Sequence, residues 1–224
     1  MRTVAVSSFA KLHHAVTPTS EPAVFRGDVD AAQPLVPHIG RTDCDLEREV
    51  RLFRDWKRQA VQFLDMPEDD WDGLTIARHY GLATRLLDWT VNPLVAAFFA
   101  AASSRAGPAA LWVFVPNRIV TDADADPFAF SGVALYRPRA LAARISRQGA
   151  VFTVHGPPQE PVSERHGELY RVDIEPSFRP ILLKDLARFG ICHASLFPGL
   201  EGLSRAMNWQ YGLDRLRPCP QERP

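Results

Sequence analysis

Residues 77–93 read ARHYGLATRLLDWTVNP, and this stretch decides how the chain folds. A helix is expected to end at His79, because Gly81 is the residue type that most readily takes the left-handed conformation just after a helix. ATRLLDW then predicts a short strand or extended segment. Asn92 and Pro93 predict the start of the next helix, with Asn92 as the cap and Pro93 in the first turn.

The strand prediction fixes which side chains share a face. Successive side chains of a strand point to opposite sides, so Arg85 and Leu87 are expected on one face and Leu86 and Asp88 on the other. Arg85 and Asp88 therefore need not face each other.

The flanking sequence predicts one α+β domain with a mixed or antiparallel sheet and flanking helices. Apolar spacing of three and four predicts an amphipathic helix over 46–64 and a second helix over 71–79, and the Ala- and Phe-rich run after Pro93 predicts a buried central helix. Strands are predicted at 23–28, 110–115, 150–155, 168–174 and 180–186, with the end of the last already helical, and a final helix is predicted from about Pro198. We expect residues 1–20 to be an N-terminal extension, 21–212 the domain and 213–224 a flexible tail.

Composition excludes several classes of protein. The 224 residues carry 26 basic and 26 acidic side chains, so no global charge draws the chain to nucleic acid or a membrane. Three widely spaced cysteines argue against a disulfide framework and a zinc ribbon. The amino terminus lacks the apolar core of a signal peptide, and the longest apolar run, 94–102, falls far short of the roughly 20 residues that span a bilayer. A soluble, cytoplasmic protein is expected.

Common catalytic and metal motifs are absent. The sequence has no G-x-S-x-G, P-loop, G-x-G-x-x-G or H-E-x-x-H pattern. The acidic segment 121–132 superficially resembles a calcium loop but lacks its glycine and final glutamate, so a solvated loop is expected there. No metal is expected.

Arg26 is the first candidate site residue. An arginine at the end of a buried strand needs an anion, and its fork of donors matches a carboxylate or a phosphate. An ion pair with Asp28 or Asp88 and a diphosphate clamp are both compatible with the spacing. In the second case Gly27 would let backbone approach the ligand.

The block 77–93 also has structural interpretations. Trp89 is expected in the core, because indole buries a large area and needs a single acceptor. Asp88 is either a brace for the neighbouring turn or a functional acid, and His79 is either a structural histidine or one that faces a ligand.

Phe25-Arg26-Gly27, followed by HYGLATRLLDWTVNPLVAAFFA at 79–100, resembles the FRG domain family, which is named for that tripeptide. Its second block usually reads close to QHYGLPTRLLDWT-x-NP. Further similarity lies in the block from Gln148 to His155 and in LFPGLEG at 196–202. The chain departs from the family pattern at Arg78, usually Gln, and at Ala83, usually Pro.

The order of these motifs is similar to that of ADP-ribosyltransferases, which implies a split sheet and NAD as a substrate. On this analogy Arg26 holds NAD, Asp88 lies in the second motif and Gln148 stands where a catalytic glutamate is expected. A neutral amide stabilises positive charge poorly, so Asp88 or Glu168 would have to supply the carboxylate. The residues assigned to the nucleotide are Phe25, Gly27, His79, Tyr80, Gly81, Thr84, Arg85 and Thr90.

Three hypotheses follow. The first is an enzyme that transfers or hydrolyses ADP-ribose from NAD, in the role of a bacterial toxin or anti-phage defence effector, with an unknown protein or nucleic-acid acceptor and an antitoxin or immunity partner. The second is a non-catalytic module that recognises a nucleotide or nucleic acid through His79, Tyr80 and Arg85. The third is a structural domain whose motifs only hold the fold together, in which Asp88→Asn would unfold the protein.

Overall fold

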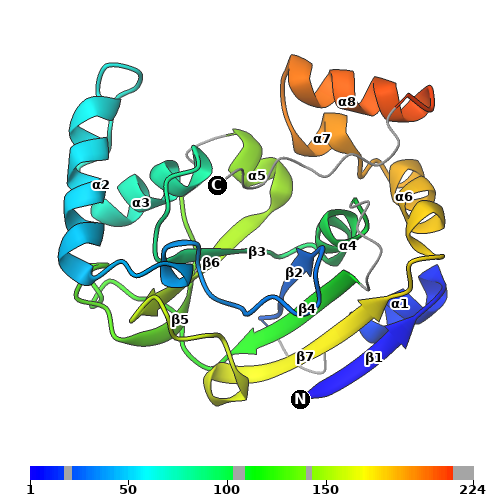
Figure 1. The fold of residues 1–224 in the computed structure, drawn as a ribbon, viewed down its shortest axis with the longest axis horizontal. Helices are drawn as coiled ribbons and strands as arrows, with labels where there is room; N and C mark the ends of the chain where they lie inside the picture. Colours follow the sequence, from blue (N-terminus) through cyan, green and yellow to red (C-terminus); the bar gives the residue numbers. More distant parts are fainter. Residues whose placement is uncertain (18–21, 103–108, 140–142, 214–224) are drawn as a thin grey trace.

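The computed structural model describes residues 1–17, 22–102, 109–139 and 143–213 (Figure 1). Its strands are β1 (Arg2–Val6), β2 (Val24–Asp28), β3 (Leu86–Thr90), β4 (Ala109–Pro116), β5 (Gly132–Tyr136), β6 (Ala150–Gly156) and β7 (Gly167–Ile174). Its α-helices are α1 (Phe9–Ala15), α2 (Leu46–Ala60), α3 (Asp70–His79), α4 (Pro93–Ala101), α5 (Ala143–Gln148), α6 (Arg179–Arg188), α7 (His193–Leu196) and α8 (Leu200–Gln210). Two short 3-10 helices, Ile39–Arg41 and Glu164–His166, complete the described elements.

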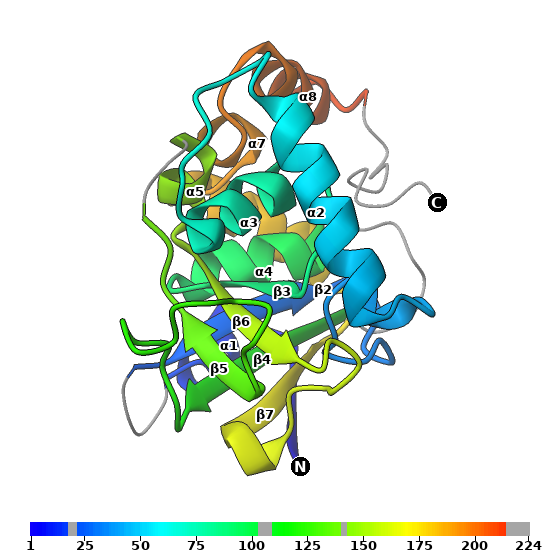
Figure 2. The same cartoon turned by 90° about the vertical axis from the view of Figure 1, so that its left-hand side faces the viewer.

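The strands form one open, mixed sheet in the order β1-β7-β4-β2-β3-β6-β5. β1 pairs parallel with β7, and the other neighbouring strands are antiparallel. Figure 2 shows α2, α3, α4, α5, α7 and α8 gathered on one side of the strands. The predicted α+β class with a mixed sheet and flanking helices is confirmed.

The sheet is weakly joined at its centre. β2 and β4 pair over five residues and β3 and β6 over five, but β2 and β3 share the single registered pair Phe25 and Thr90. The sheet therefore consists of a four-stranded part, β1-β7-β4-β2, and a three-stranded part, β3-β6-β5, that meet at one pair of residues.

The core lies on both faces of this sheet. On the helix side, α4 covers β2 and β4, and α3 covers β3, β5 and β6. On the opposite side the apolar side chains of the central strands, Trp89 among them, are covered by Leu35 and Val162 from connecting segments. The prediction that Trp89 is buried in the core is confirmed.

Gly27 sets how closely α4 approaches the sheet. A Cβ at this position would lie 1.9 Å from the carbonyl oxygen of Ala96 and 2.6 Å from the backbone nitrogen of Ala100. The tight contact is possible because glycine has no Cβ. The close backbone approach predicted at Gly27 is therefore made by a helix of the same chain.

Most predicted elements are found, and the helices around residues 77–93 are placed closely. α3 and α4 occupy the predicted ranges, Asn92 accepts from the N–H of Leu94 at 2.9 Å, and Gly81 has φ +94°. The predicted helix over 46–64 ends earlier, at Ala60.

The strand predicted at 180–186 is wrong. These residues belong to helix α6, in which Leu182, Leu183 and Leu186 are buried. Their spacing of three and four puts them on one helical face, and Pro180 is tolerated because it lies in the first turn. The elements β1, α1, β5, α5 and α7 are not among the predicted ones.

The segment expected to be an N-terminal extension joins the same core. Val6 of β1 and Leu12 of α1 are buried beside residues of β7 and α6. Of the predicted flexible tail 213–224, all but Leu213 lies outside the described residues. Within the described residues no helix has both the length and the apolarity needed to cross a membrane.

Candidate functional site

The candidate site is centred on Asp88, in the middle of β3. Leu86, Asp88 and Thr90 alternate with Leu87 and Trp89 along the strand, so Asp88 points to the helix side of the sheet. Leu86 and Thr90 are buried there, whereas the Asp88 side chain keeps 41% of its surface exposed. The strand thus presents one accessible carboxylate between two buried residues.

Arg78 of α3 reaches this carboxylate. Its Nε and Nη2 donate to Oδ2 of Asp88 at 3.0 and 2.6 Å. Arg78 is positioned by the helix itself, which is capped by the side chain of Asp69 at its start and followed by Gly81 in the left-handed region at its end.

These contacts keep Asp88 ionised. Burial by itself would raise its pKa, but the charge and hydrogen bonds of Arg78, the charge of Arg26 and a hydrogen bond from its own backbone N–H together lower the pKa below its ordinary value. Asp88 is therefore a fixed negative charge near neutral pH rather than a proton donor.

Arg26 approaches Asp88 from β2. Its Nη1 donates to the backbone carbonyl oxygen of Asp88 at 2.9 Å, and its Nη2 lies 3.3 Å from Oδ2 of Asp28. The two interpretations of Arg26 as an ion-pair residue are thus resolved in favour of Asp28, with Asp88 engaged through its backbone.

Gln148 ends α5 and lies close to the same strand. Its carbonyl oxygen accepts from the hydroxyl of Thr90 at 2.6 Å, and its amide donates to the carbonyl oxygen of Leu196 at 3.1 Å. Asp88 is two residues from Thr90 on the same strand face, a rise of about 7 Å. Gln148 thus contacts β3 at Thr90, two residues from Asp88, and its side-chain amide is bonded to Leu196.

Glu168, the other acid considered for this role, lies elsewhere. It is exposed on β7, which is separated from β3 by β4 and β2, and it pairs in register with Val115. Three strand spacings amount to about 14 Å. Glu168 does not belong to the cluster around Asp88.

Several residues assigned to a nucleotide from the sequence are used inside the protein. Phe25 is part of the core under α4, and Gly27 contacts α4 directly. The Thr84 hydroxyl accepts from the N–H of Leu86, and the Thr90 hydroxyl joins β3 to α5. These four residues build the scaffold and present no exposed group at Asp88.

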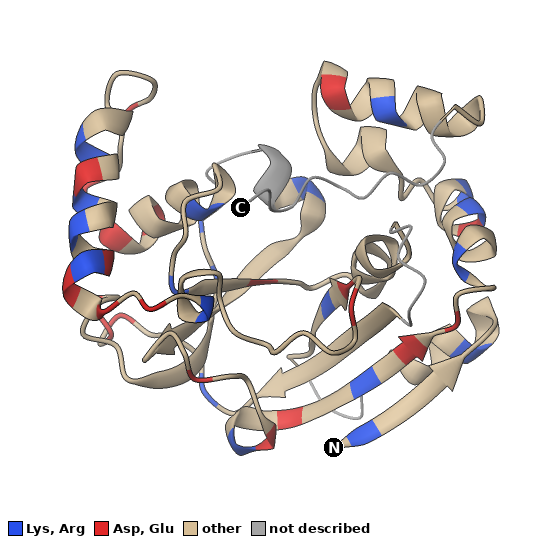
Figure 3. Ribbon diagram, viewed as in Figure 1, with Lys and Arg blue, Asp and Glu red and all other residues tan. Residues whose placement is uncertain are grey.

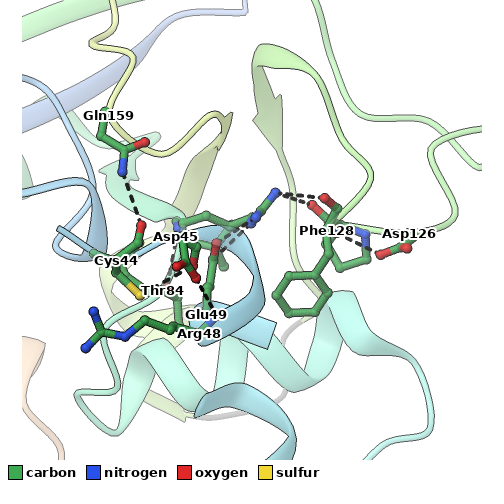
Figure 4. Close-up of polar contacts among 12 residues, drawn as sticks. Cys44, Asp45, Arg48, Glu49, Thr84, Asp126, Phe128 and Gln159 are labelled. Atoms are coloured by element: carbon green, nitrogen blue, oxygen red, sulfur yellow. Dashed lines mark hydrogen bonds and ion pairs between the residues drawn. The ribbon is translucent and has the colours of Figure 1, made fainter. Parts of the chain in front are cut away.

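Arg85 is the clearest difference from the predicted nucleotide site. The residue is 1% exposed, and its Nε and Nη2 donate to the two carboxylate oxygens of Glu49 on α2 at 2.9 and 2.6 Å. Its Nη1 donates to the carbonyl oxygen of Pro127, and its guanidinium lies over the ring of Phe128. Figure 4 labels Glu49 and Phe128, two of the residues that contact Arg85 in this cluster. Arg85 ties α2 and the segment before β5 to β3.

The remaining residues assigned to a nucleotide, His79, Tyr80 and Gly81, lie at the end of α3. Tyr80 is 65% exposed and its ring contacts that of His79 edge to face, with centroids 4.9 Å apart. Two helical positions correspond to about 200° of rotation, so Tyr80 points away from the side on which Arg78 reaches Asp88. Tyr80 and Gly81 thus form an exposed end of the helix, and His79 before them is partly buried.

Sequence reasoning missed Arg78 as a site residue. The available signal was its position one residue before His79, at the place where the chain departs from the usual family pattern. Its contact with Asp88 depends on how α3 lies over β3, which spacing along the chain does not determine.

No group of three or more metal-ligating side chains lies together in the described part of the chain. Figure 3 shows basic and acidic residues interspersed along α2, in agreement with the balanced net charge.

Comparison with known families identifies the central segment. The model of the FRG domain family matches residues 21–108, which include Arg26, Arg78 and Asp88. The chain contains an FRG domain. In this FRG domain, the tripeptide that names the family has three separate structural roles: Phe25 fills the core, Arg26 binds the Asp88 carbonyl, and Gly27 admits α4. No curated protein and no solved structure gives a significant match.

Proposed function

We propose that the FRG domain binds an NAD-type nucleotide at the Asp88 cluster, defined by Arg26, Arg78 and Asp88, and transfers or hydrolyses its ADP-ribose. The observation that carries the proposal is the partly exposed carboxylate of Asp88, kept ionised where the two parts of the sheet separate. A fixed negative charge suits a reaction in which positive charge develops on a sugar ring.

The proposed reaction breaks the bond between C1′ of the ribose and the nicotinamide nitrogen. The bonding electron pair goes to that nitrogen and neutralises its positive charge. An oxygen of water or of an acceptor forms the new bond to C1′ and releases its proton to solvent. Asp88 stabilises the transition state through its charge, since arginine contacts hold it ionised.

The proposed cellular role rests on the proposed consumption of NAD or transfer of ADP-ribose. A cytoplasmic enzyme that consumes NAD or modifies cellular targets is harmful to its own cell, so the proposal includes a toxin or defence role and an antitoxin or immunity partner. Growth arrest on expression of the wild type, relieved by Asp88→Asn, is the expected result.

A second candidate is a non-catalytic module that recognises a nucleotide or nucleic acid. The observation that favours it is the exposed Tyr80 next to the ring of His79, since an exposed aromatic ring can stack on a base. Arg85 is no longer part of this candidate, because it is buried against Glu49.

Calorimetric titration separates the two candidates. NAD, ADP-ribose and a short single-stranded RNA are titrated into the wild type, Asp88→Asn and the control Asp185→Asn, which removes a carboxylate from the surface pair with Arg188 on α6. We expect NAD binding that Asp88→Asn weakens by about tenfold or more and Asp185→Asn leaves unchanged. RNA binding that weakens with salt, without NAD binding, would favour the recognition module and contradict the enzyme.

A further inference from the structure

The backbone of Asp88 lies where β3 loses its neighbour. β2 and β3 pair at Phe25 and Thr90, and continuation of that antiparallel ladder would place Gly27 opposite Asp88. No such pair is formed between these described residues. The backbone groups of Asp88 on this side therefore need partners other than a strand.

The carbonyl group finds its partner in a side chain. The carbonyl oxygen of Asp88 accepts from Nη1 of Arg26 at 2.9 Å. Arg26 is held in turn by Asp28, two residues along the same strand. Arg26 thus bridges the opening between β2 and β3 in place of the missing strand contact.

We propose that Arg26 is a positioning residue: it fixes the backbone of Asp88 across the opening between β2 and β3, and so sets the direction of the Asp88 carboxylate. This inference rests on the proposed role of Asp88. It replaces the assignment of Arg26 as a residue that holds NAD directly. Arg26 and Arg78 hold Asp88 at two different atoms, the first at the backbone and the second at the carboxylate.

The rival interpretation is a direct contact between Arg26 and the ligand. Its Nε is buried and meets no hydrogen-bond acceptor among the described residues, so a ligand oxygen is a conceivable partner. The two roles differ in what they require of Asp88: a positioning residue acts only through Asp88, whereas a phosphate contact acts without it.

A matched control exists on β7. Nε of Arg171 lies 2.7 Å from Oδ1 of Asp173, two residues along its strand, and Nη2 of Arg26 lies 3.3 Å from Oδ2 of Asp28 in the same way. Arg171 donates to the carbonyl oxygen of Ala31 and lies over the ring of Trp112, and its strand is separated from β3 by β4 and β2. Arg171→Met therefore removes the same kind of pair and leaves Asp88 untouched.

The first experiment is carbon-detected NMR on the ligand-free protein. Arg26→Met is expected to shift the signal of the Asp88 backbone carbonyl and to raise the pKa of its carboxyl, because it removes both a hydrogen bond and a charge. Arg26→Lys, which keeps the charge, is expected to shift the carbonyl with a smaller change in pKa. Arg171→Met should change neither. Unaltered Asp88 signals in both folded Arg26 variants would overturn the positioning role.

The second experiment is a double-mutant cycle on nicotinamide release from NAD. Arg26→Met is expected to lower kcat by about tenfold in the wild type and by less than about twofold when Asp88 is already Asn. An equal loss in both backgrounds would mean that Arg26 contacts the ligand independently and would overturn the inference. Absence of NAD turnover in the wild type would reject the proposed function, and the NMR experiment would still decide whether Arg26 positions Asp88.

Discussion

Arg26 donates a hydrogen bond to the backbone carbonyl oxygen of Asp88, at 2.9 Å, at the point where strands β2 and β3 separate. The Arg26 side chain of β2 thereby supplies a hydrogen bond to β3 at a position where the backbones of the two strands do not pair. The contact links the tripeptide near the start of the FRG domain to the block that contains Asp88, 62 residues later in the chain. The central acid of the proposed site is held by the same residue that joins the two parts of the sheet.

Arg78→Gln should raise the pKa of Asp88 toward its ordinary value, because the charge and hydrogen bonds of Arg78 lower it. A carboxyl with a lowered pKa in the folded state adds stability above its unfolded pKa, and that stability is lost as the pH falls through the folded pKa. The variant should therefore be less stable than the wild type near neutral pH, and the difference in stability should shrink in strong acid. NMR titration of the Asp88 carboxyl measures the shift directly, and an unchanged titration would show that the Arg78 contact is not formed in solution.

Glu49→Ala should destabilise the protein by about 3–5 kcal/mol, because it leaves the guanidinium of Arg85 buried without its carboxylate. The control is Glu47→Ala on the same helix, where the pair with Arg51 is exposed and a change within about 0.5 kcal/mol is expected. Urea unfolding of both variants provides the comparison. Equal effects of the two substitutions would contradict a structural role for Arg85.

Gly27→Ala should cost about 3 kcal/mol or more, since its Cβ would collide with the backbone of α4. Gly81→Ala provides a useful contrast, because its Cβ would meet open space and the expected cost of about 1 kcal/mol comes from the positive φ alone. Thermal unfolding distinguishes the two. A tolerated alanine at 27 would mean that α4 does not approach β2 as closely as described.

His155 should make the protein sensitive to mild acid. Burial is the main cause that lowers its pKa to about 4, with His166 and Arg85 nearby also lowering it. The indole of Trp89 donates to the Thr153 hydroxyl, which then donates to Nε2 of His155, so the neutral ring donates from Nδ1 to the carbonyl oxygen of Glu160.

Because the folded pKa of His155 lies below its unfolded value of about 6.5, its unfolded form takes up the proton first. Stability is full above pH ~6.5 and falls as the pH drops toward 4, by about 3 kcal/mol in all. Urea unfolding between pH 7.5 and 4 should show this loss, and His155→Gln should reduce the slope. The exposed His13→Gln serves as the control. An identical slope in all three proteins would mean that other groups cause the acid sensitivity.

Much of the fold follows from local sequence signals. Gly81, Asn92 and Pro93 act within a few residues of their own positions, so α3, β3 and α4 were predicted closely. Residues 180–186 were misassigned because a run of apolar residues fits a buried strand as well as a helix, and the three-four spacing of its leucines was the better signal.

The candidate site was predicted only in part, because its contacts depend on how distant segments pack together. Arg26 and Asp88 were both identified, but the contact runs to the Asp88 backbone, which no side-chain pattern reveals. Arg85 was assigned to a ligand because an arginine in a short strand needs an anion, and its anion is Glu49, 36 residues away on α2. Arg78 was missed because its contact depends on the placement of a helix over a strand.

The most direct test of the account is nicotinamide release from NAD by the wild type, Asp88→Asn and the surface control Asp185→Asn, with folding of each checked by circular dichroism. If Asp88 supplies the charge that stabilises the transition state, Asp88→Asn should lower kcat on the order of a hundredfold while Asp185→Asn retains full activity. A folded wild type that releases no nicotinamide, or a folded Asp88→Asn that is as active as the wild type, would contradict it.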